Sequence, residues 1–299
     1  MIPVAFDPIY VLPLPENHRF PMEKYDLLHR QLIHEGTCEP EDFFSPTSID
    51  YDSVTAIHNK VYVEHLKGLE LTKAEIRKIG FPISQQLIDR EFIIAGGTLS
   101  GSLKALKGGI AFNIAGGTHH AFSSHGEAFC LLNDQAIAAQ YLLEKKLAKK
   151  ILIIDLDVHQ GNGTAEIFQK EDQVFTFSMH GKKNYPFKKE KSDLDIGLED
   201  KTNDKTYLEI LKEVLPNLLK NVKPDFIFYL SGVDILKSDR LGRLGVSIQG
   251  CKERDQMVLK LCHEEDIAVQ CSMGGGYSKD IKLIIEAHAN TYRVAKKIY

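Results

Sequence analysis

The segment from Ile151 to Thr164 combines a buried-strand pattern with side chains that could bind a metal. Its first four residues are apolar, which predicts a strand buried on both faces, as in a parallel sheet. Asp155, Asp157 and His159 then occupy every second position, so in an extended chain they point to one side. Desolvating these groups without a partner is costly, and a divalent metal is the simplest partner, because oxygen and nitrogen ligands of this kind suit zinc. The alternative is an ordinary strand with an N-cap Asp and an unrelated His.

Three other segments also place polar residues directly after a predicted strand. His119 and His120 follow one strand, Asp234 follows a second and Tyr277 follows a third. Each alone has a structural alternative, such as a surface His pair, a helix N-cap or an aromatic plug in a turn. Because ligands bind outside the carboxyl ends of parallel strands, the repetition predicts one shared site.

The predicted site has the parts that hydrolysis of an amide requires. Asp157, His159 and Asp234 would supply three zinc ligands and leave a fourth position open for water. Zinc lowers the pKa of such a water and polarises a carbonyl oxygen.

The remaining residues of the group would move protons and stabilise charge. His119 and His120 could take a proton from water and return it to a leaving group. Tyr277, on a Gly-rich loop, could donate to the developing oxyanion. Asp155 is placed to accept a hydrogen bond from a His and so to orient it.

Strands that alternate with helices predict a single α/β domain over residues 1–299, with three α/β/α layers and a mostly parallel central sheet. The expected strands are 4–11, 109–114, 151–154, 173–179, 225–230 and 267–272. The expected helices are 24–28, 59–69, 84–106, 133–146, 204–219, 249–263 and 279–298. The segments 38–52 and 185–202 are expected to be loops.

Composition narrows the class of protein. Of the 299 residues, 43% are hydrophobic and 26% are charged, which is typical of a globular chain. A net charge of −4 does not favour direct binding to nucleic acid. No apolar run approaches the ~20 residues of a membrane span. Five scattered cysteines without a CxxC pair, and no signal peptide, predict reduced thiols in a cytoplasmic protein, or a nuclear one in a eukaryote.

Five motifs carry a resemblance to a known family. They are GGTHHA at 116–121, EAFCLLND at 127–134, DLDVHQGNGT at 155–164, SGVD at 231–234 with DRLG at 239–242, and GGGY at 274–277. In this order they resemble the zinc-dependent histone deacetylases of the arginase–deacetylase superfamily, from about His18 to the last helix. The HRFPMEKY start and the Gln160-Gly161-Asn162 run are most similar to class IV and its bacterial relatives.

The resemblance implies a role for each site residue. The implied zinc ligands are Asp157, His159 and Asp234. His120 matches the general base and acid, and His119 matches an electrostatic partner held by Asp155. Tyr277 matches the residue that polarises the scissile carbonyl.

The resemblance also implies a substrate tunnel and a second ion. Phe129 and Ala128 would line the acyl-lysine tunnel with Gly275, and either Tyr185 or Phe187 would form the opposite wall. The residues that match a structural monovalent-cation site, usually for potassium, are Asp155, Asp157, His159, Ser178 and Met179.

Asn162 departs from the commoner family pattern. It stands where many members carry the Asp behind the second His, and the resemblance implies that it orients His120. A neutral partner stabilises an imidazolium less than a carboxylate does. We therefore expect a lower pKa for His120 than in relatives with Asp, which favours its role as a base.

These observations favour a zinc-dependent deacylase that removes acetyl or longer acyl groups from lysine in a protein or peptide, with no membrane or nucleic-acid partner. One alternative is a deacetylase of acetylpolyamines or other small amides. An arginase-like binuclear manganese enzyme is weaker, because it would need further ligands. A non-catalytic module that binds acyl-lysine is disfavoured, because every catalytic position carries a competent residue.

Overall fold

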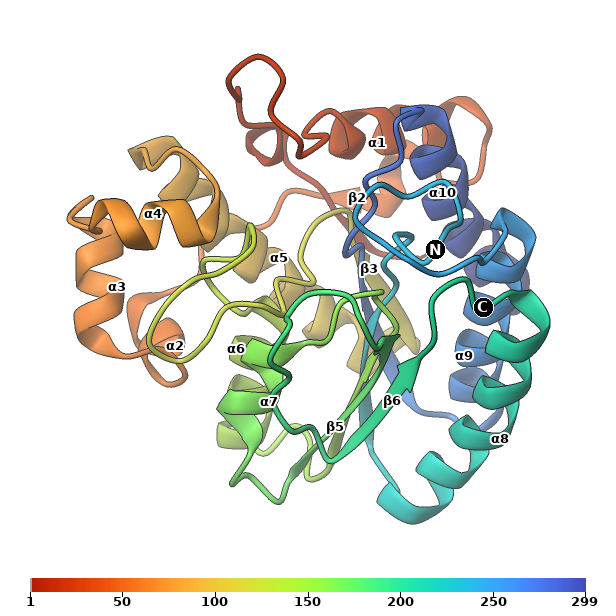
Figure 1. The fold of residues 1–299 in the computed structure, drawn as a ribbon. Helices are drawn as coiled ribbons and strands as arrows, with labels where there is room; N and C mark the ends of the chain where they lie inside the picture. Colours follow the sequence, from red (N-terminus) through yellow and green to blue (C-terminus); the bar gives the residue numbers. More distant parts are fainter. Residues whose placement is uncertain (1) are drawn as a thin grey trace.

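An eight-stranded sheet forms the centre of the protein (Figure 1). The computed structural model describes residues 2–299, and all the strand pairs of its sheet are parallel. The strands are β1 (Val4–Ala5), β2 (Phe43–Phe44), β3 (Ile110–Asn113), β4 (Ile151–Asp155), β5 (Val174–Gly181), β6 (Leu194–Leu198), β7 (Phe226–Leu230) and β8 (Ala268–Ser272). Their order across the sheet is β2-β1-β3-β8-β7-β4-β5-β6.

Helices cover both faces of the sheet. The helices are α1 (Lys24–His34), α2 (Tyr51–Thr55), α3 (Lys60–Lys67), α4 (Lys73–Ile79), α5 (Gln85–Gly108), α6 (Asp134–Glu144), α7 (Asn162–Phe168), α8 (Asp204–Val222), α9 (Ile248–Glu264) and α10 (Ile281–Ile298). One layer contains α5, α6 and α7, and the other contains α1, α8, α9 and α10. The predicted three-layer α/β/α domain is therefore confirmed.

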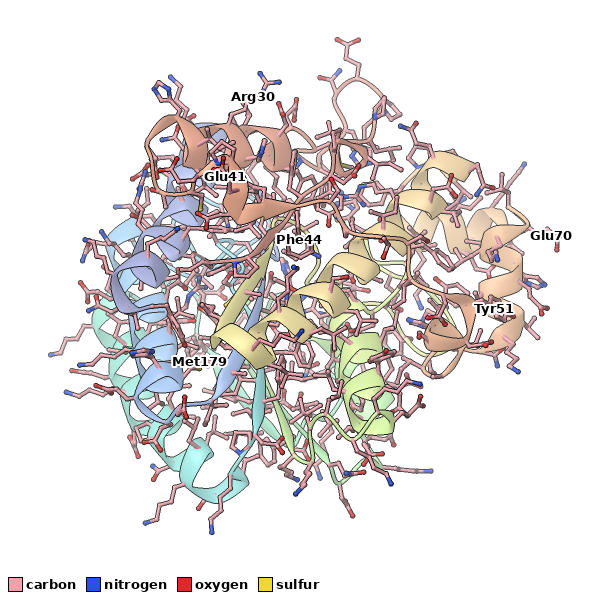
Figure 2. All side chains as sticks on the ribbon, turned by 180° about the vertical axis from the view of Figure 1, so that it is seen from behind. Arg30, Glu41, Phe44, Tyr51, Glu70 and Met179 are labelled. Carbon is pink, nitrogen blue, oxygen red and sulfur yellow. The ribbon has the colours of Figure 1, made fainter. Side chains whose placement is uncertain are left out.

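The short helices α2, α3 and α4 form a group beside α5 (Figure 1). Tyr51 and Glu70 mark this group in the view from behind (Figure 2). Across residues 2–299, none of the helices combines the length and the apolar character that a membrane crossing requires.

The order in which the strands are added to the sheet reverses at its centre, between β7 and β4. From β4 the chain continues through α7 to β5, whereas β7 lies on the other side of β4 and continues through α9. The two connections run to opposite faces of the sheet, so a crevice opens at the carboxyl ends of β4 and β7. Such a switch point is where open α/β sheets bind ligands.

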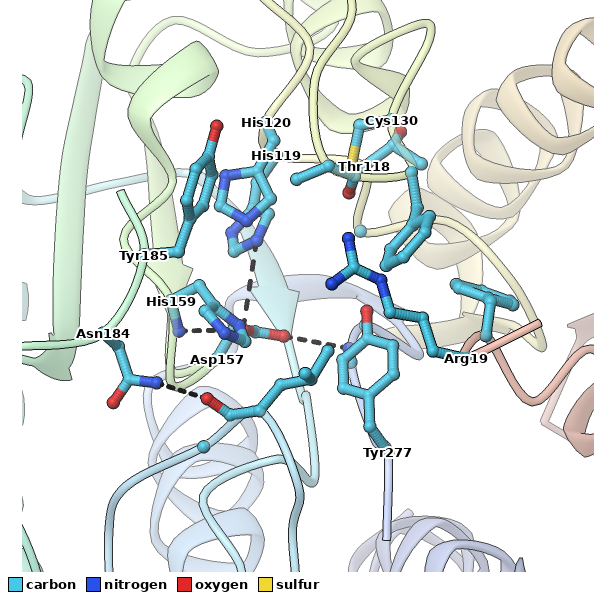
Figure 3. Close-up of a pocket in the computed structure, with 18 of the residues that line it drawn as sticks. Arg19, Thr118, His119, His120, Cys130, Asp157, His159, Asn184, Tyr185 and Tyr277 are labelled. Atoms are coloured by element: carbon cyan, nitrogen blue, oxygen red, sulfur yellow. Dashed lines mark hydrogen bonds and ion pairs between the residues drawn. The ribbon is translucent and has the colours of Figure 1, made fainter. Parts of the chain in front are cut away.

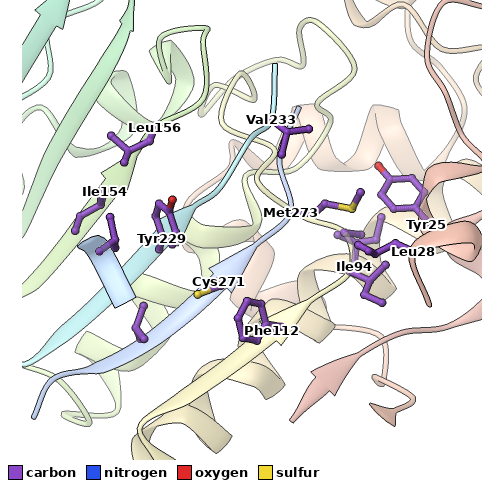
Figure 4. Close-up of a cluster of buried hydrophobic side chains, with 14 of the residues drawn as sticks. Tyr25, Leu28, Ile94, Phe112, Ile154, Leu156, Tyr229, Val233, Cys271 and Met273 are labelled. Carbon is purple, nitrogen blue, oxygen red and sulfur yellow. The ribbon is translucent and has the colours of Figure 1, made fainter. Parts of the chain in front are cut away.

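A row of buried side chains lies one residue below this edge. Ile154, Tyr229, Cys271 and Phe112 pair in register across β4, β7, β8 and β3 (Figure 4). All four are at most 2% exposed. Because interiors are close-packed, this row fixes the strand ends that carry the site.

Three predicted segments differ in type from the structure. The strand predicted at 4–11 is only Val4–Ala5, because Pro8 begins a 3-10 helix, η1 (Pro8–Tyr10), that ends the pairing. The loop predicted at 185–202 contains the edge strand β6. Leu194, Ile196 and Leu198 alternate there with Asp195 and Gly197, which is a strand pattern hidden by the surrounding charges. The predicted loop at 38–52 similarly contains β2 and the 3-10 helix η2 (Pro40–Asp42).

Candidate active site

Asp157, His159 and Asp234 lie together at the carboxyl ends of β4 and β7, and all three are buried. Each offers one ligand atom, and these atoms lie within 4.8 Å of one another. Nδ1 of His159 is 3.1 Å from a carboxylate oxygen of each Asp. Tetrahedral ligands of zinc lie roughly 3.3 Å apart, so the spacing of the group fits a zinc ion.

The electrostatics of this group also favour a cation. Burial, followed by repulsion from Asp157, raises the pKa of Asp234 to about 7. Burial alone would lower the pKa of His159, but hydrogen bonds to Asp157 and Asp234 outweigh it and raise that pKa to about 10. The raised pKa of His159 shows that the two carboxylates attract positive charge, which a divalent ion would supply in place of the proton.

Backbone groups of neighbouring loops orient the two carboxylates. Gly275 N donates to Asp157 Oδ2 over 2.9 Å, and Val158 N donates to Asp234 Oδ1 over 2.9 Å. A Cβ atom at position 275 would overlap an oxygen of Asp234. Asp157, His159 and Asp234 are called the metal group below. Only glycine allows the loop after β8 to approach this group so closely.

The His pair stands beside this group with two different partners. His119 Nδ1 donates to Asp155 Oδ2 over 2.7 Å, and His120 Nδ1 donates to Asn162 Oδ1 over 2.6 Å. The two ring centroids are 4.1 Å apart. Because Nδ1 of His120 carries its hydrogen toward Asn162, the neutral ring keeps Nε2 as a proton acceptor.

The two imidazoles have opposite pKa shifts. Burial opposes protonation of both rings. In His119 the charge and hydrogen bond of Asp155 outweigh burial and raise the pKa. In His120 burial and then the charges of His119 and His159 lower the pKa well below its usual value. Burial thus favours the neutral form of His120, whereas Asp155 shifts His119 toward the charged form.

Tyr277 approaches the metal group from the end of β8. Its backbone N donates to Asp239 Oδ2 over 2.6 Å. Its side chain reaches into the pocket, where its ring centroid lies 6.4 Å from that of His159 (Figure 3). Burial, followed by the charges of Asp157 and Asp234, raises the pKa of the phenol well above its usual value. The hydroxyl therefore keeps its proton and can donate a hydrogen bond.

A cavity of about 630 Å³ is lined by His119, His120, Asp157, His159 and Tyr277 (Figure 3). Phe129, Ala128, Tyr185 and Gly275 line it as well. Ala128 and Phe129 have φ values of 43° and 69°, a strained conformation that places the Phe129 ring in the wall. Tyr185 lies beside His120, with ring centroids 5.1 Å apart, whereas Phe187 is 92% exposed at the rim. Of the two candidates for the opposite wall, Tyr185 is therefore the inner one.

The residues predicted to bind potassium lie on β4, the segment that follows it and β5. Ser178 pairs with Asp155 in the sheet, and Met179 is the next residue along β5. Ser178 Oγ lies 3.0 Å from His180 Nδ1. The potassium site stays a prediction.

Sequence reasoning missed several residues that hold the site. Lys24 of α1 is fully buried, and its Nζ donates to Gly274 O over 3.0 Å beneath the Tyr277 ring. Arg254 of α9 is also fully buried and donates to the carbonyl oxygens of Gly232 and Ser231. A basic residue in an amphipathic helix usually faces solvent, so no sequence signal distinguishes these two.

Glu127 lies in a motif quoted above but had no assigned role. Its carboxylate accepts a hydrogen bond from the Tyr185 hydroxyl and forms an ion pair with Lys78. It thereby links the inner wall of the cavity to the mouth.

Comparison with known proteins agrees with this geometry. The profile of the histone deacetylase domain matches residues 18–292. The chain belongs to the histone deacetylase domain family. Family membership places it among the deacetylases, which are hydrolases that act on amide bonds.

Relatives match over most of the chain. An uncharacterized protein of Picosynechococcus is 44% identical over 297 residues, covering 99% of both chains. Histone deacetylase 2 of Arabidopsis thaliana is 28% identical, covering 90% of this chain and 72% of its own. The acetoin utilization protein AcuC of Staphylococcus aureus is 29% identical, covering 87% and 72%.

A solved structure shares the fold. The crystal structure of the HDA15 HD domain superposes with a TM-score of 0.83 at 22% identity, covering 99% of this chain and 88% of that one. The likeness supports the sheet order and layers described above.

Proposed function

We propose that this protein is a zinc-dependent deacylase that removes acetyl or longer acyl groups from the side-chain amine of lysine. The observation that carries the proposal is the neutral base His120 beside a three-ligand group, with the Tyr277 hydroxyl in the same cavity. When bound, one zinc ion would acidify water and polarise the scissile carbonyl. Asp157, His159 and Asp234 would hold it.

The side chains around that group divide the remaining work. His120 Nε2 takes a proton from the attacking water and later delivers it to the leaving amine. His119, held by Asp155, keeps positive charge beside the developing negative charge. Tyr277 donates a hydrogen bond to the former carbonyl oxygen. Asn162 fixes the His120 tautomer that this proton transfer requires.

The cavity suits a long side chain that ends in an amide. Phe129 and Tyr185 would flank the methylene chain of the lysine, and Ala128 and Gly275 would supply the rest of the wall. A structural potassium ion beside Asp155 and Ser178 is part of the proposal.

We also propose kinship with class IV and its bacterial relatives, and a cytoplasmic location. The similarity of the HRFPMEKY start supports the first. Five buried free cysteines support a reducing compartment.

A substrate panel tests the proposed function. It contains one neutral peptide with acetyl-lysine, the same peptide with long-chain acyl-lysine, and acetylpolyamines, each assayed with the zinc-loaded protein. We expect turnover of at least one acyl-lysine peptide. Turnover of acetylpolyamines alone would replace the proposal with a small-amine deacetylase. Binding of the peptides without turnover would replace it with a binding module.

A further inference from the structure

The mouth of the cavity is strongly basic. Five exposed cationic side chains line it: Arg19, Lys78, Lys183, Arg240 and Arg243. A sixth, Arg90, is buried and paired with Glu91. Among the described residues that line the cavity, the one carboxylate is the buried Asp157 of the metal group. The rim therefore attracts negative charge.

Neighbouring carboxylates neutralise only part of this charge. Glu127 pairs with Lys78. Asp200 lies 2.6 Å from Arg243 and 4.0 Å from Lys183, so one carboxylate serves two cations. Five cations against two carboxylates leave an excess of three positive charges at the mouth.

Arg19 and Arg240 carry the unneutralised charge most directly. Within residues 2–299, no carboxylate lies within 4.0 Å of either guanidinium. The Arg19 guanidinium lies over the Phe129 ring, 5.3 Å from its centroid, and so projects above the wall of the cavity (Figure 3). An exposed guanidinium without a partner is free to form an ion pair with an incoming carboxylate.

The rim also extends beyond the cavity wall. Phe187, which directly precedes Lys188 in the sequence, lines the mouth and is 92% exposed. A large apolar ring in this position is more readily covered by a polypeptide than by a small amine. The rim therefore fits a partner that continues outside the cavity on both sides of the acyl-lysine.

We propose that this mouth selects acyl-lysines that lie in acidic segments of a protein, with Arg19 and Arg240 as specificity-determining residues. This inference rests on the proposed function and names its substrate class. Carboxylates that flank the acyl-lysine pair with the two guanidinium groups. Cationic substrates, such as acetylpolyamines or Lys- and Arg-rich tails, are repelled by the same charges.

The test uses three acetyl-lysine peptides that differ only in the two residues on each side, which are Asp, Ala or Lys. We expect kcat/KM to fall in the order Asp, Ala, Lys, with each step about three- to tenfold at low salt. Both steps shrink at high salt, because exposed charges are screened. Equal kcat/KM on the three peptides would contradict the inference and leave the proposed function intact. No turnover of any peptide would contradict the proposed function itself.

Charge-reversal variants test whether Arg19 and Arg240 cause the dependence of kcat/KM on peptide charge. The double variant R19E/R240E should reverse the ratio of kcat/KM between the Asp and Lys peptides, with the Ala peptide as the reference. The double variant K212E/K220E provides the matched control, because both lysines are exposed on α8 and neither lines the cavity. An unchanged ratio in the double variant, or the same reversal in the control, would remove Arg19 and Arg240 from the specificity of the enzyme.

Discussion

The metal group with its neighbouring His pair and Tyr277, here called the inner site, differs from the mouth of the cavity in burial and in charge pairing. In the inner site, Asp155, Asp157 and Asp234 are each at most 3% exposed, and each accepts hydrogen bonds from named partners. At the mouth, Arg19 and Arg240 are exposed and have no carboxylate partner within 4.0 Å among residues 2–299. We infer that the ends of the strands position the groups for chemistry, whereas the loops around the mouth would select the substrate.

Loss of the Tyr277 hydroxyl should have the largest effect of a single substitution that spares the metal ligands. Tyr277→Phe removes one oxyanion donor, which costs about a hundredfold to a thousandfold in kcat. Zinc content should not change, because the hydroxyl is not a proposed ligand. Tyr141→Phe on α6, outside the cavity, is the control and should retain full activity. Near-normal turnover in Tyr277→Phe would remove this residue from the mechanism.

Lys24 tests whether a buried cation outside the metal group positions the inner site. Lys24→Met removes the hydrogen bond to Gly274 O, so the loop that carries Gly275 and Tyr277 loses a support. We expect kcat to fall about tenfold to a hundredfold with little change in KM. The free energy of unfolding should not decrease, because methionine replaces a desolvated charge with an apolar chain of similar length.

A second variant distinguishes a positioning role of Lys24 from a packing role. Lys24→Arg keeps a donor and should recover part of kcat. Unchanged kcat in Lys24→Met would show that Lys24 acts only by filling space.

Asn162 should set the pH at which His120 becomes available as a base. An Asn162→Asp carboxylate would stabilise protonated His120 and raise its pKa. Because the base acts in its neutral form, the acidic limb of the pH profile of kcat/KM should move to higher pH, by about one unit. A limb that stays in place would show that Asn162 does not set the proton affinity of His120.

Phe187 should show the smallest effect and mark the boundary between the two regions. Phe187→Ala removes an exposed rim contact, so KM for an acetyl-lysine peptide should rise about two- to threefold while kcat stays constant. Hydrolysis of a small acetyl-lysine amide should not change. A loss of kcat would show that the rim contributes to the chemistry.

The residues at the strand ends could be predicted from the sequence, because their pattern is local. Asp157, His159 and Asp234 follow apolar strands, and period-two spacing with Gly-rich turns is visible without coordinates. His119, His120 and Tyr277 were found by the same rule, because parallel strand ends meet at one edge. The alternation of strands and helices predicts a mostly parallel sheet, and every strand pair in the structure is parallel.

The remaining features depend on contacts between distant segments. Lys24 and Arg254 look like surface residues of amphipathic helices, yet each is fully buried against loops of the site. The sequence could not choose between Tyr185 and Phe187, because a long loop between β5 and β6 decides which ring faces inward. The short edge strand β6 was missed in the same loop.

One zinc ion, held by Asp157, His159 and Asp234, should be required for deacylation. This requirement is tested by titrating metal-free protein with zinc while measuring bound zinc and hydrolysis of an acetyl-lysine peptide. We predict that activity is absent without metal, rises in proportion to bound zinc and saturates at one ion per chain. Full activity in the metal-free protein, or a zinc-loaded protein that hydrolyses no acyl-lysine substrate, would contradict the account.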